Sequence, residues 1–333
     1  MREFKPHALL RNAHAMTLAG ALWPRPTPRL PRGQVRLFEV EAGTQLLAKC
    51  HWQERPRECP TLVMVHGLEG SSESSYMRGL AEMAFGAGFN AVRLNQRNCG
   101  GSERLTPMLY NSGLSGDYRA VLFELIERDQ LPELFFAGYS MGGNLVMKMA
   151  GELGAEAPAE LRGVCGVCPT INLAACVNAL EAPGNRLYEW NFVLGLKGRL
   201  WRKRKIFPGR FSFAGLDSVK TVRAFDDVVT APSFGFRDAA EYYERSSAIR
   251  VAERIAVPTL ILTAKDDPFV PFAPFRAAAV TGNARIEVMA PEFGGHCSFI
   301  SAERGVERRW AEPRVVEFCR RQLGDLGAEG PKG

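Results

Sequence analysis

The 333-residue sequence predicts an α/β fold in which a mainly parallel central sheet is flanked by helices. Short apolar segments alternate with segments of helical periodicity, as in chains built from strand–helix–strand units. The apolar segments are continuous, which is expected of strands buried on both faces. One of them, residues 134–137, runs directly into the pentapeptide Gly-Tyr-Ser-Met-Gly at residues 138–142, and a helix-like stretch follows it.

The first predicted elements form a hairpin. Residues 34–40 and 45–52 are β-like runs, and the turn between them contains Gly43. Residues 61–65 then form a continuous apolar strand that ends at His66-Gly67. This order places the first internal strand immediately before a short loop that contains two glycines.

Helices and strands then alternate. Residues 76–87 are helix-like and precede the apolar strand at 90–94. Residues 117–128 have a helical period because Val121, Leu122, Leu125 and Ile126 fall on one face. The remaining predicted strands are residues 134–137, 161–168, 258–263 and 284–289, and the remaining predicted helices are residues 141–153 and 314–323.

Residues 171–255 interrupt this alternation. They are rich in aromatic and basic side chains and lack the apolar strands of the rest of the chain. We therefore predict a core formed by residues 1–170 and 256–326, with an N-terminal arm at residues 1–33. Residues 171–255 are predicted to form a cap over the carboxyl ends of the strands. Residues 327–333 are expected to be a frayed tail.

Composition excludes several classes of protein. Hydrophobic residues make up 46% of the chain and charged residues 23%, which is ordinary for a soluble globular protein. No apolar run is long enough for a transmembrane helix, and the first residues make a poor export signal. Eight cysteines in a chain of this length do not indicate a disulfide scaffold, so reduced thiols and a cytoplasmic location are expected. Cys165 and Cys168 have no second pair nearby, so no metal site is expected there.

Part of the formal charge of +6 is concentrated at residues 197–210. The basic residues of this segment are Lys197, Arg199, Arg202, Lys203, Arg204, Lys205 and Arg210. One interpretation is a solvated face of the cap. The alternative is a surface that contacts anionic lipid or an acidic partner at the periphery of a membrane. No nucleic-acid partner is expected, because no nucleic-acid-binding motif accompanies the segment.

The pentapeptide at residues 138–142 matches the G-x-S-x-G nucleophile elbow of the α/β-hydrolase fold. The pattern alone occurs by chance, but here it has the strand before it and the helix after it that the elbow requires. The sharp turn needs very small residues at Gly138 and Gly142, where strand and helix converge. We therefore predict Ser140 as the nucleophile; the alternative is a small residue at a tight turn with no chemistry.

A serine nucleophile needs a base and an orienting carboxylate. In this fold they follow in the order Ser, Asp or Glu, His, and His296 is the only histidine after Ser140. The acid is expected at the end of the strand at 258–263, where Asp266 and Asp267 lie. Asp267 is preferred because it precedes a proline, Pro271, by four positions, as in many serine hydrolases. Asp266 would then be a supporting carboxylate or a turn residue.

The acyl-transfer intermediate carries an oxyanion that requires preorganised N–H donors. The backbone amide after the nucleophile, that of Met141, is one predicted donor. The second is predicted in the loop after residues 61–65, at Leu68, which follows His66-Gly67. His66 precedes Ser140 and is expected to shape this loop.

Several further blocks make the chain resemble the YheT-like branch of the α/β-hydrolases. That branch is similar to eukaryotic abhydrolase-domain lipid esterases and to yeast medium-chain ethanol acyltransferases. The matching blocks run nearly end to end and are residues 10–17, 66–72 with Tyr76, 95–101, 110–113, 225–227, 230–232, 235–236, 242–243, 266–268 and 294–296. The chain departs from the branch at Asn98, at Asn111, and at Cys297-Ser298 after the histidine.

The resemblance implies a serine carboxylic-ester hydrolase that uses Ser140, Asp267 and His296, with no metal or other cofactor. The expected substrates are short- to medium-chain acyl esters, which are small molecules, and the expected intermediate is an acyl-enzyme. An acyltransferase or thioesterase with the same three residues is the alternative. A catalytically silent relative that binds lipid belongs to another class of function.

Overall fold

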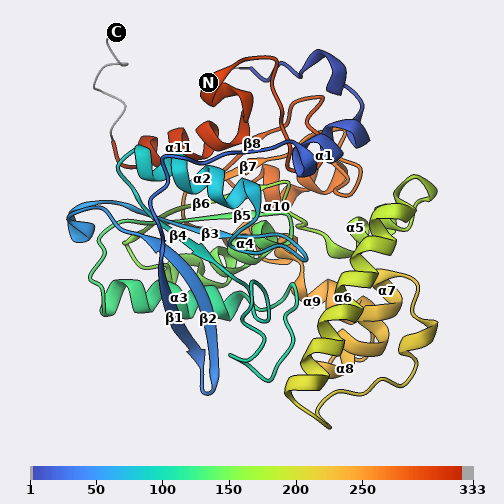
Figure 1. Cartoon of the computed structure of the whole chain (residues 1–333). Coiled ribbons are helices and arrows are strands. Elements are labelled where there is room, and N and C mark those ends of the chain that lie inside the picture. Colours follow the sequence, from blue (N-terminus) through green and yellow to red (C-terminus); the bar gives the residue numbers. More distant parts are fainter. Residues whose placement is uncertain (1–2, 325–333) are drawn as a thin grey trace.

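A computed structural model of the chain describes residues 3–324. The tail expected at residues 327–333 lies outside the described residues. Figure 1 shows a central sheet with helices on both faces and a further group of helices beside one end of it.

The sheet confirms the predicted α/β-hydrolase fold. Its eight strands lie in the order β1-β2-β4-β3-β5-β6-β7-β8. The strands are β1 (Gln34–Glu41), β2 (Thr44–His51), β3 (Thr61–Val65), β4 (Asn90–Leu94), β5 (Leu134–Tyr139), β6 (Leu161–Val167), β7 (Thr259–Leu262) and β8 (Ile286–Met289). β1 and β2 form the predicted antiparallel hairpin, and β2 also pairs antiparallel with β4. All pairs from β4 to β8 are parallel.

The strands bury both faces, as their continuous apolar sequences predict. In β3, Val63 and Val65 belong to one core cluster, whereas Leu62 and Met64 belong to the other. The first cluster includes side chains of α3 (Ser115–Glu127) and α4 (Met141–Leu153), and the second includes those of α2 (Ser75–Gly86) and α11 (Ala311–Gln322). Figure 1 shows α2 and α11 on the opposite side of the sheet from α3.

Between β6 and β7 the chain forms helices and no strands. The α-helices among them are α5 (Leu173–Leu180), α6 (Arg186–Ile206), α7 (Val222–Phe225), α8 (Ala231–Ser233) and α9 (Ala239–Ser246). We call residues 171–255 the cap, following the sequence prediction. The described α-helices that remain are α1 (Ala13–Leu22), in the N-terminal arm, and α10 (Ala278–Thr281). Among residues 3–324, no helix combines the length and the apolar character needed to cross a membrane.

The interpretation of residues 197–210 as a solvated face is wrong for Arg199 and Lys203, which are buried. Both lie on the face of α6 that buries Leu196 and Leu200, because positions 196, 199, 200 and 203 share one side of a helix. Lys203 donates hydrogen bonds to the backbone carbonyls of Glu103 and Thr106. Burial lowers the pKa of Lys203 to about 8.

Candidate active site

Ser140 lies in the turn between β5 and α4, with φ 52° and ψ −118°. A positive φ is strained for a residue with a side chain, and it persists only where the surrounding structure imposes it. The strand before the turn and the helix after it have the bounds that the sequence predicts within two residues. The turn presents the serine at the N-terminus of α4, where backbone N–H groups favour negative charge.

The two glycines of the elbow leave no room for a side chain. A Cβ atom on Gly138 would lie 2.1 Å from the carbonyl oxygen of Gly142. A Cβ atom on Gly142 would lie 2.4 Å from the carbonyl oxygen of Val65. Both obstacles are backbone atoms, which cannot move without disturbing the sheet or the helix.

We expect Gly138→Ala to lower the free energy of unfolding by about 3 kcal/mol, because the added methyl group must separate strand from helix. Gly116→Ala is the matched control, since a Cβ atom at Gly116 in α3 meets no atom within 4 Å. The control is expected to leave stability unchanged or to raise it by up to about 1 kcal/mol. Urea unfolding measures both, and equal stabilities of the two variants would contradict the steric argument.

His296 and Asp267 are joined by a hydrogen bond. His296 Nδ1 lies 2.9 Å from Asp267 Oδ2, and the carboxylate is fully buried. Asp267 Oδ1 accepts hydrogen bonds from the backbone N–H groups of Phe269 (2.8 Å) and Val270 (3.0 Å). The carboxylate is therefore fixed by two amides, and it holds the imidazole with its proton on Nδ1, which leaves Nε2 free to accept a proton.

The N-terminal arm positions the histidine loop, a role that the sequence did not reveal. The backbone N–H of His296 donates to Thr17 Oγ1 at 2.9 Å, and this hydroxyl donates to the carbonyl of Ala13. The ring of Phe269 contacts the imidazole edge to face, with 4.8 Å between centroids. Thr17 lies in the matching block at residues 10–17, and this block was the only available signal of its role.

Asp266 does not contact the imidazole. Its Oδ1 accepts a hydrogen bond from the backbone N–H of Gly295 at 2.9 Å. Its Oδ2 is buried and has no hydrogen-bond partner among residues 3–324. Burial raises the pKa of this carboxyl above its ordinary value. Asp266 thus supports the glycine loop before His296, whereas Asp267 contacts His296 itself.

His66 shapes the loop after β3, as expected. His66 Nε2 accepts a hydrogen bond from the backbone N–H of Gln96 at 3.0 Å, so the ring proton is on Nδ1 and is donated to the carbonyl of Gly67 at 2.8 Å. Burial lowers the pKa of His66 to about 4, which keeps the ring neutral. Because the peptide bond is trans, fixing the Gly67 carbonyl directs the N–H of Leu68 to the opposite side.

The cap contacts the loop after β3 through an ion pair. Arg199 of α6 contacts both oxygens of Glu69, with Nε 3.0 Å from Oε1 and a terminal nitrogen 3.1 Å from Oε2. Tyr110 donates its hydroxyl to Glu69 Oε1 at 2.6 Å. Arg199 also donates to the carbonyl of Asn98, one of the positions at which the chain departs from the resembling branch. A buried bidentate pair of this kind links the position of α6 to that of the loop carrying Leu68.

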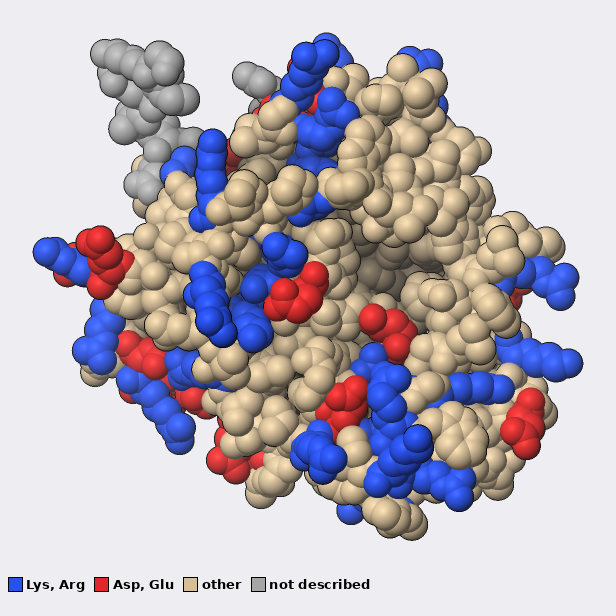
Figure 2. All heavy atoms as spheres, in the orientation of Figure 1, with Lys and Arg blue, Asp and Glu red and all other residues tan. Residues whose placement is uncertain are grey.

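Ser140 and His296 line the same two cavities. The first cavity lies under the cap and is mostly apolar. Its apolar lining comprises Leu68, Leu109, Tyr110, Met141, Leu173, Cys176, Val177, Leu180, Phe192, Leu196, Val222, Phe225, Tyr242, Tyr243 and Phe269. The second cavity is lined partly by α1. Figure 2 shows a hollow with mostly uncharged walls, which in the orientation of Figure 1 lies between α1 and helices α5 and α6.

The structure therefore brings Asp267 and His296 into contact and places Ser140, Leu68 and Met141 on the wall of the same cavity. Asn111, another departure from the branch, also lines this cavity. The sequence did not identify Arg199 as a link between cap and loop. Within a run of seven basic residues, nothing local distinguishes the two that are buried, Arg199 and Lys203.

Comparisons with known proteins agree with this architecture. The family model described as "Serine aminopeptidase, S33" matches residues 56–288. Among solved structures, the esterase Pf2001 of Pyrococcus furiosus superposes with a TM-score of 0.57 and 16% identity, over 90% of this chain and 98% of that one. The 2,6-dihydroxy-pseudo-oxynicotine hydrolase superposes with a TM-score of 0.59 and 16% identity, over 96% of this chain and 75% of that one. At such identities the superpositions show the fold alone.

Relatives with higher sequence identity show to which branch of the superfamily the chain belongs. The Escherichia coli K12 protein YheT, provisionally named an esterase, is 32% identical over 95% of this chain and 92% of its own length. The "Medium-chain fatty acid ethyl ester synthase/esterase 2" of Saccharomyces cerevisiae is 29% identical over 89% of this chain and 67% of its own length. Mouse "Phospholipase ABHD3" is 28% identical over 72% of this chain but only 58% of its own length. The chain therefore belongs to the α/β-hydrolase superfamily, in its YheT-like branch.

Proposed function

We propose that this protein is a serine carboxylic-ester hydrolase that acts on short- to medium-chain acyl esters through an acyl-enzyme intermediate. The observation that carries the proposal is the 2.9 Å hydrogen bond between Asp267 and His296, at a cavity whose wall also holds Ser140 in its strained turn. The superfamily and the relatives named as esterases, lipases and phospholipases support ester hydrolysis as the general chemistry.

In this mechanism His296 Nε2 accepts the proton of Ser140 as the hydroxyl oxygen attacks the ester carbonyl. Asp267 stabilises the imidazolium that forms, and the backbone N–H groups of Leu68 and Met141 bind the oxyanion. The imidazolium then protonates the leaving alcohol, and the acyl group remains on Ser140. A water molecule, deprotonated by His296, attacks the acyl-enzyme and releases the carboxylic acid.

The cavity under the cap supports an acyl chain as the group bound beside Ser140. Its walls are formed by aliphatic and aromatic side chains from α5, α6 and α7. Burial of each methylene in such a cavity contributes about 0.8 kcal/mol. The length of chain that the cavity accepts is therefore expected to appear as a maximum in kcat/KM across a series of esters.

The test combines covalent labelling with a substrate series. A fluorophosphonate probe is expected to add to the protein once, and peptide mapping is expected to place the adduct on Ser140. Hydrolysis of p-nitrophenyl esters of increasing acyl length then gives kcat/KM. Absence of labelling and of hydrolysis would reject the proposal and would favour a catalytically silent lipid-binding relative.

Transfer of the acyl group to an alcohol or thiol is a second candidate, favoured by the relative named as an ethyl ester synthase as well as an esterase. Water and an alcohol compete for the same acyl-enzyme, so the outcome depends on how far the closed site excludes water. Product analysis with an added alcohol such as ethanol separates the two. More transfer product than free acid would make the protein an acyltransferase.

The pH dependence of the reaction follows from the contact between His296 and Asp267. Burial lowers the pKa of His296, but the Asp267 carboxylate and the neighbouring Cys297 outweigh burial and raise the pKa above the ordinary 6.5. The base must be neutral, so activity is gained only as pH rises through this raised pKa. We expect the acidic limb of kcat/KM to have its midpoint above pH 6.5, measured with a neutral ester. A midpoint below that value would contradict the assignment of His296 as the base.

We also propose that the outer face of α6 makes peripheral contact with anionic lipid. Leu187, Trp190, Leu194 and Trp201 are large apolar residues with 47% to 81% of their surface exposed, and their spacing places them in one stripe. Arg204 and Lys205 are exposed at the end of the same helix, and Figure 2 shows basic side chains gathered near its lower end. A helix with an apolar stripe and flanking cations is typical of an interfacial contact.

If α6 makes this contact, the protein is expected to bind vesicles that contain phosphatidylserine and to bind vesicles of pure phosphatidylcholine only weakly. Replacing Trp190 and Trp201 by serine is expected to lower the bound fraction, measured by co-sedimentation, by about tenfold or more. Trp52 offers a control, because it lies beside Gln34 and Asp129, outside the cap. Equal binding by the stripe variant and the native protein would reject the contact, and concentration-dependent dimers without vesicles would assign the stripe to a second copy of the chain.

A further inference from the structure

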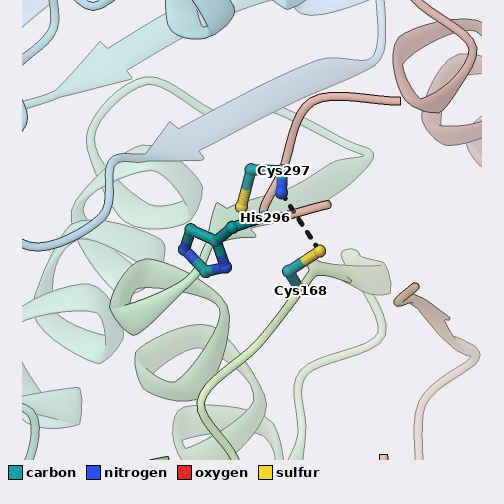
Figure 3. Close-up of side chains that lie close together, drawn as sticks. All are labelled: Cys168, His296 and Cys297. Carbon is teal, nitrogen blue, oxygen red and sulfur yellow. Dashed lines mark hydrogen bonds between the residues drawn. The ribbon is translucent and has the colours of Figure 1, made fainter. Parts of the chain in front are cut away.

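A cluster of soft donor atoms lies beside the proposed base. Cys168 follows the last residue of β6, and Cys297 follows His296 in the chain. One donor atom from each of Cys168, His296 and Cys297 lies within 4.8 Å of the others. Figure 3 shows the three side chains close together, with the Cys297 side chain on the side of His296 and Cys168 Sγ facing the backbone nitrogen of Cys297. Cys168 is buried and the other two are half-buried.

The backbone holds both thiols in place through weak hydrogen bonds. The N–H of Cys297 donates to Cys168 Sγ at 3.3 Å, the dashed line in Figure 3. Cys297 Sγ donates to the carbonyl of Val167 at 3.5 Å, and Cys168 Sγ donates to that of Gly295 at 3.8 Å. The amide that faces Cys168 Sγ would stabilise a thiolate there. The long bonds to the carbonyls are easily replaced by a stronger ligand.

Two thiolates and an imidazole form a donor set that Zn²⁺ prefers. Zinc binds sulfur at about 2.3 Å and nitrogen at about 2.0 Å in a tetrahedron, so its ligands lie about 3.5 to 3.8 Å from one another. Each pair of donor atoms must therefore approach by about 1.3 Å at most, which rotation of the half-buried Cys297 side chain can supply. A water molecule or the nearby Asp267 carboxylate could complete the tetrahedron. Mg²⁺ and Ca²⁺ prefer oxygen ligands and do not fit.

We propose that Cys168, His296 and Cys297 bind a soft divalent cation of the zinc class, and that this ion inhibits the enzyme. Binding releases the two thiol protons and changes no oxidation state, so removal of the ion by a chelator restores the free side chains. The ion is an inhibitor and takes no part in ester hydrolysis.

Inhibition follows whichever imidazole nitrogen binds the ion. If Nε2 binds, the nitrogen that accepts the Ser140 proton is blocked. If Nδ1 binds, the hydrogen bond to Asp267 is lost. The inhibitory effect thus rests on the proposed function of His296, whereas binding of the ion does not.

The experiment measures binding and inhibition separately. Co²⁺ is added to the metal-free reduced protein, and a thiolate-to-cobalt charge-transfer band is expected at one equivalent, lost on addition of Zn²⁺. Esterase activity is then measured against free Zn²⁺ set by a chelator buffer. The variants are Cys168→Ser and Cys297→Ser, with the alanine substitutions as a second pair if serine disturbs folding. Cys59→Ser is the matched control, because Cys59 is a half-buried free thiol outside the cluster.

In the cluster variants the Zn²⁺ concentration for half-inhibition is expected to rise at least about 100-fold, since even loss of a second-shell partner costs 10- to 100-fold in affinity. The Cys59→Ser control should match the native protein, and each variant is compared with its own metal-free activity. Unchanged inhibition of the cluster variants, or a cobalt spectrum without the thiolate band, would overturn the proposal. If activity is lost in metal-free buffer and restored by a reductant, Cys168 and Cys297 form a disulfide instead of a metal site. A cobalt band without any esterase activity would preserve the site and reject the proposed function.

Discussion

Replacement of Ser140 by alanine is expected to lower kcat for ester hydrolysis by about 10⁵- to 10⁶-fold. The acyl-enzyme cannot form without the hydroxyl, so the loss corresponds to about 7 to 8 kcal/mol of transition-state stabilisation. The variant should fold normally, because Ser140 has already been placed in its positive-φ turn by the surrounding glycines and alanine has the same Cβ atom. Steady-state hydrolysis of a p-nitrophenyl ester measures kcat, and circular dichroism checks the fold.

Ser112→Ala is the matched control for this prediction. Ser112 lines the same cavity and is buried, whereas Ser140 is half-buried, and the backbone of Ser112 forms hydrogen bonds with Tyr242 and Asn144. Its kcat is therefore expected to stay within about tenfold of the native value, since no reacting group is lost. A Ser140→Ala variant that hydrolyses esters as fast as the Ser112→Ala variant would show that the nucleophile lies elsewhere.

The second large effect is expected at Asp267. Asp267→Asn should lower kcat by about 10⁴-fold, because an amide cannot stabilise the imidazolium and can hold His296 in the wrong tautomer. The substitution keeps the shape of the side chain, so the backbone contacts at Phe269 and Val270 can remain. Because the loss of the carboxylate also removes the main interaction that raises the pKa of His296, the acidic limb should move to lower pH.

Asp266→Asn provides the matched comparison, since the neighbouring carboxyl contacts the N–H of Gly295 and not the imidazole. An amide oxygen can accept the same hydrogen bond, so we expect kcat to fall less than about tenfold. The ratio of the two effects, measured on one ester under the same conditions, distinguishes the acid from its neighbour. A larger loss for Asp266→Asn would reverse the assignment.

Most of the sheet could be predicted because the relevant signals are local. The runs at residues 61–65 and 90–94 are continuous and apolar, and they form β3 and β4 with those bounds. Strands of this kind are buried on both faces, so they can be predicted from their own residues without knowing which segments pack against them. Helix α1 was not predicted. It buries only Met16 and Thr17, so no helical period of apolar residues marks it.

The cap shows where local patterns fail. Arg199 and Lys203 belong to a basic run that favours a solvated face, yet both are buried against residues about a hundred positions away. A buried cation is stable only when particular carboxylates or carbonyls surround it, and Glu69 and Glu103 supply these groups from loops of the core. No feature within residues 197–210 predicts those partners.

The sequence by itself determined the alternation of strands and helices that defines the fold class, and the elbow at residues 138–142. At Gly138 the steric requirement is local, because a Cβ atom there would meet the backbone of Gly142 in the helix that follows the strand. The sequence also limited the candidate base to His296, since no other histidine follows Ser140. Only the tertiary structure decided that Asp267 rather than Asp266 contacts this imidazole, that Thr17 holds its loop, and that Cys168 lies beside Cys297. Those contacts join segments up to 279 positions apart. The parallel sheet aligns the carboxyl ends of β6, β7 and β8, which precede Cys168, Asp267 and His296, whereas Thr17 reaches the same place from α1.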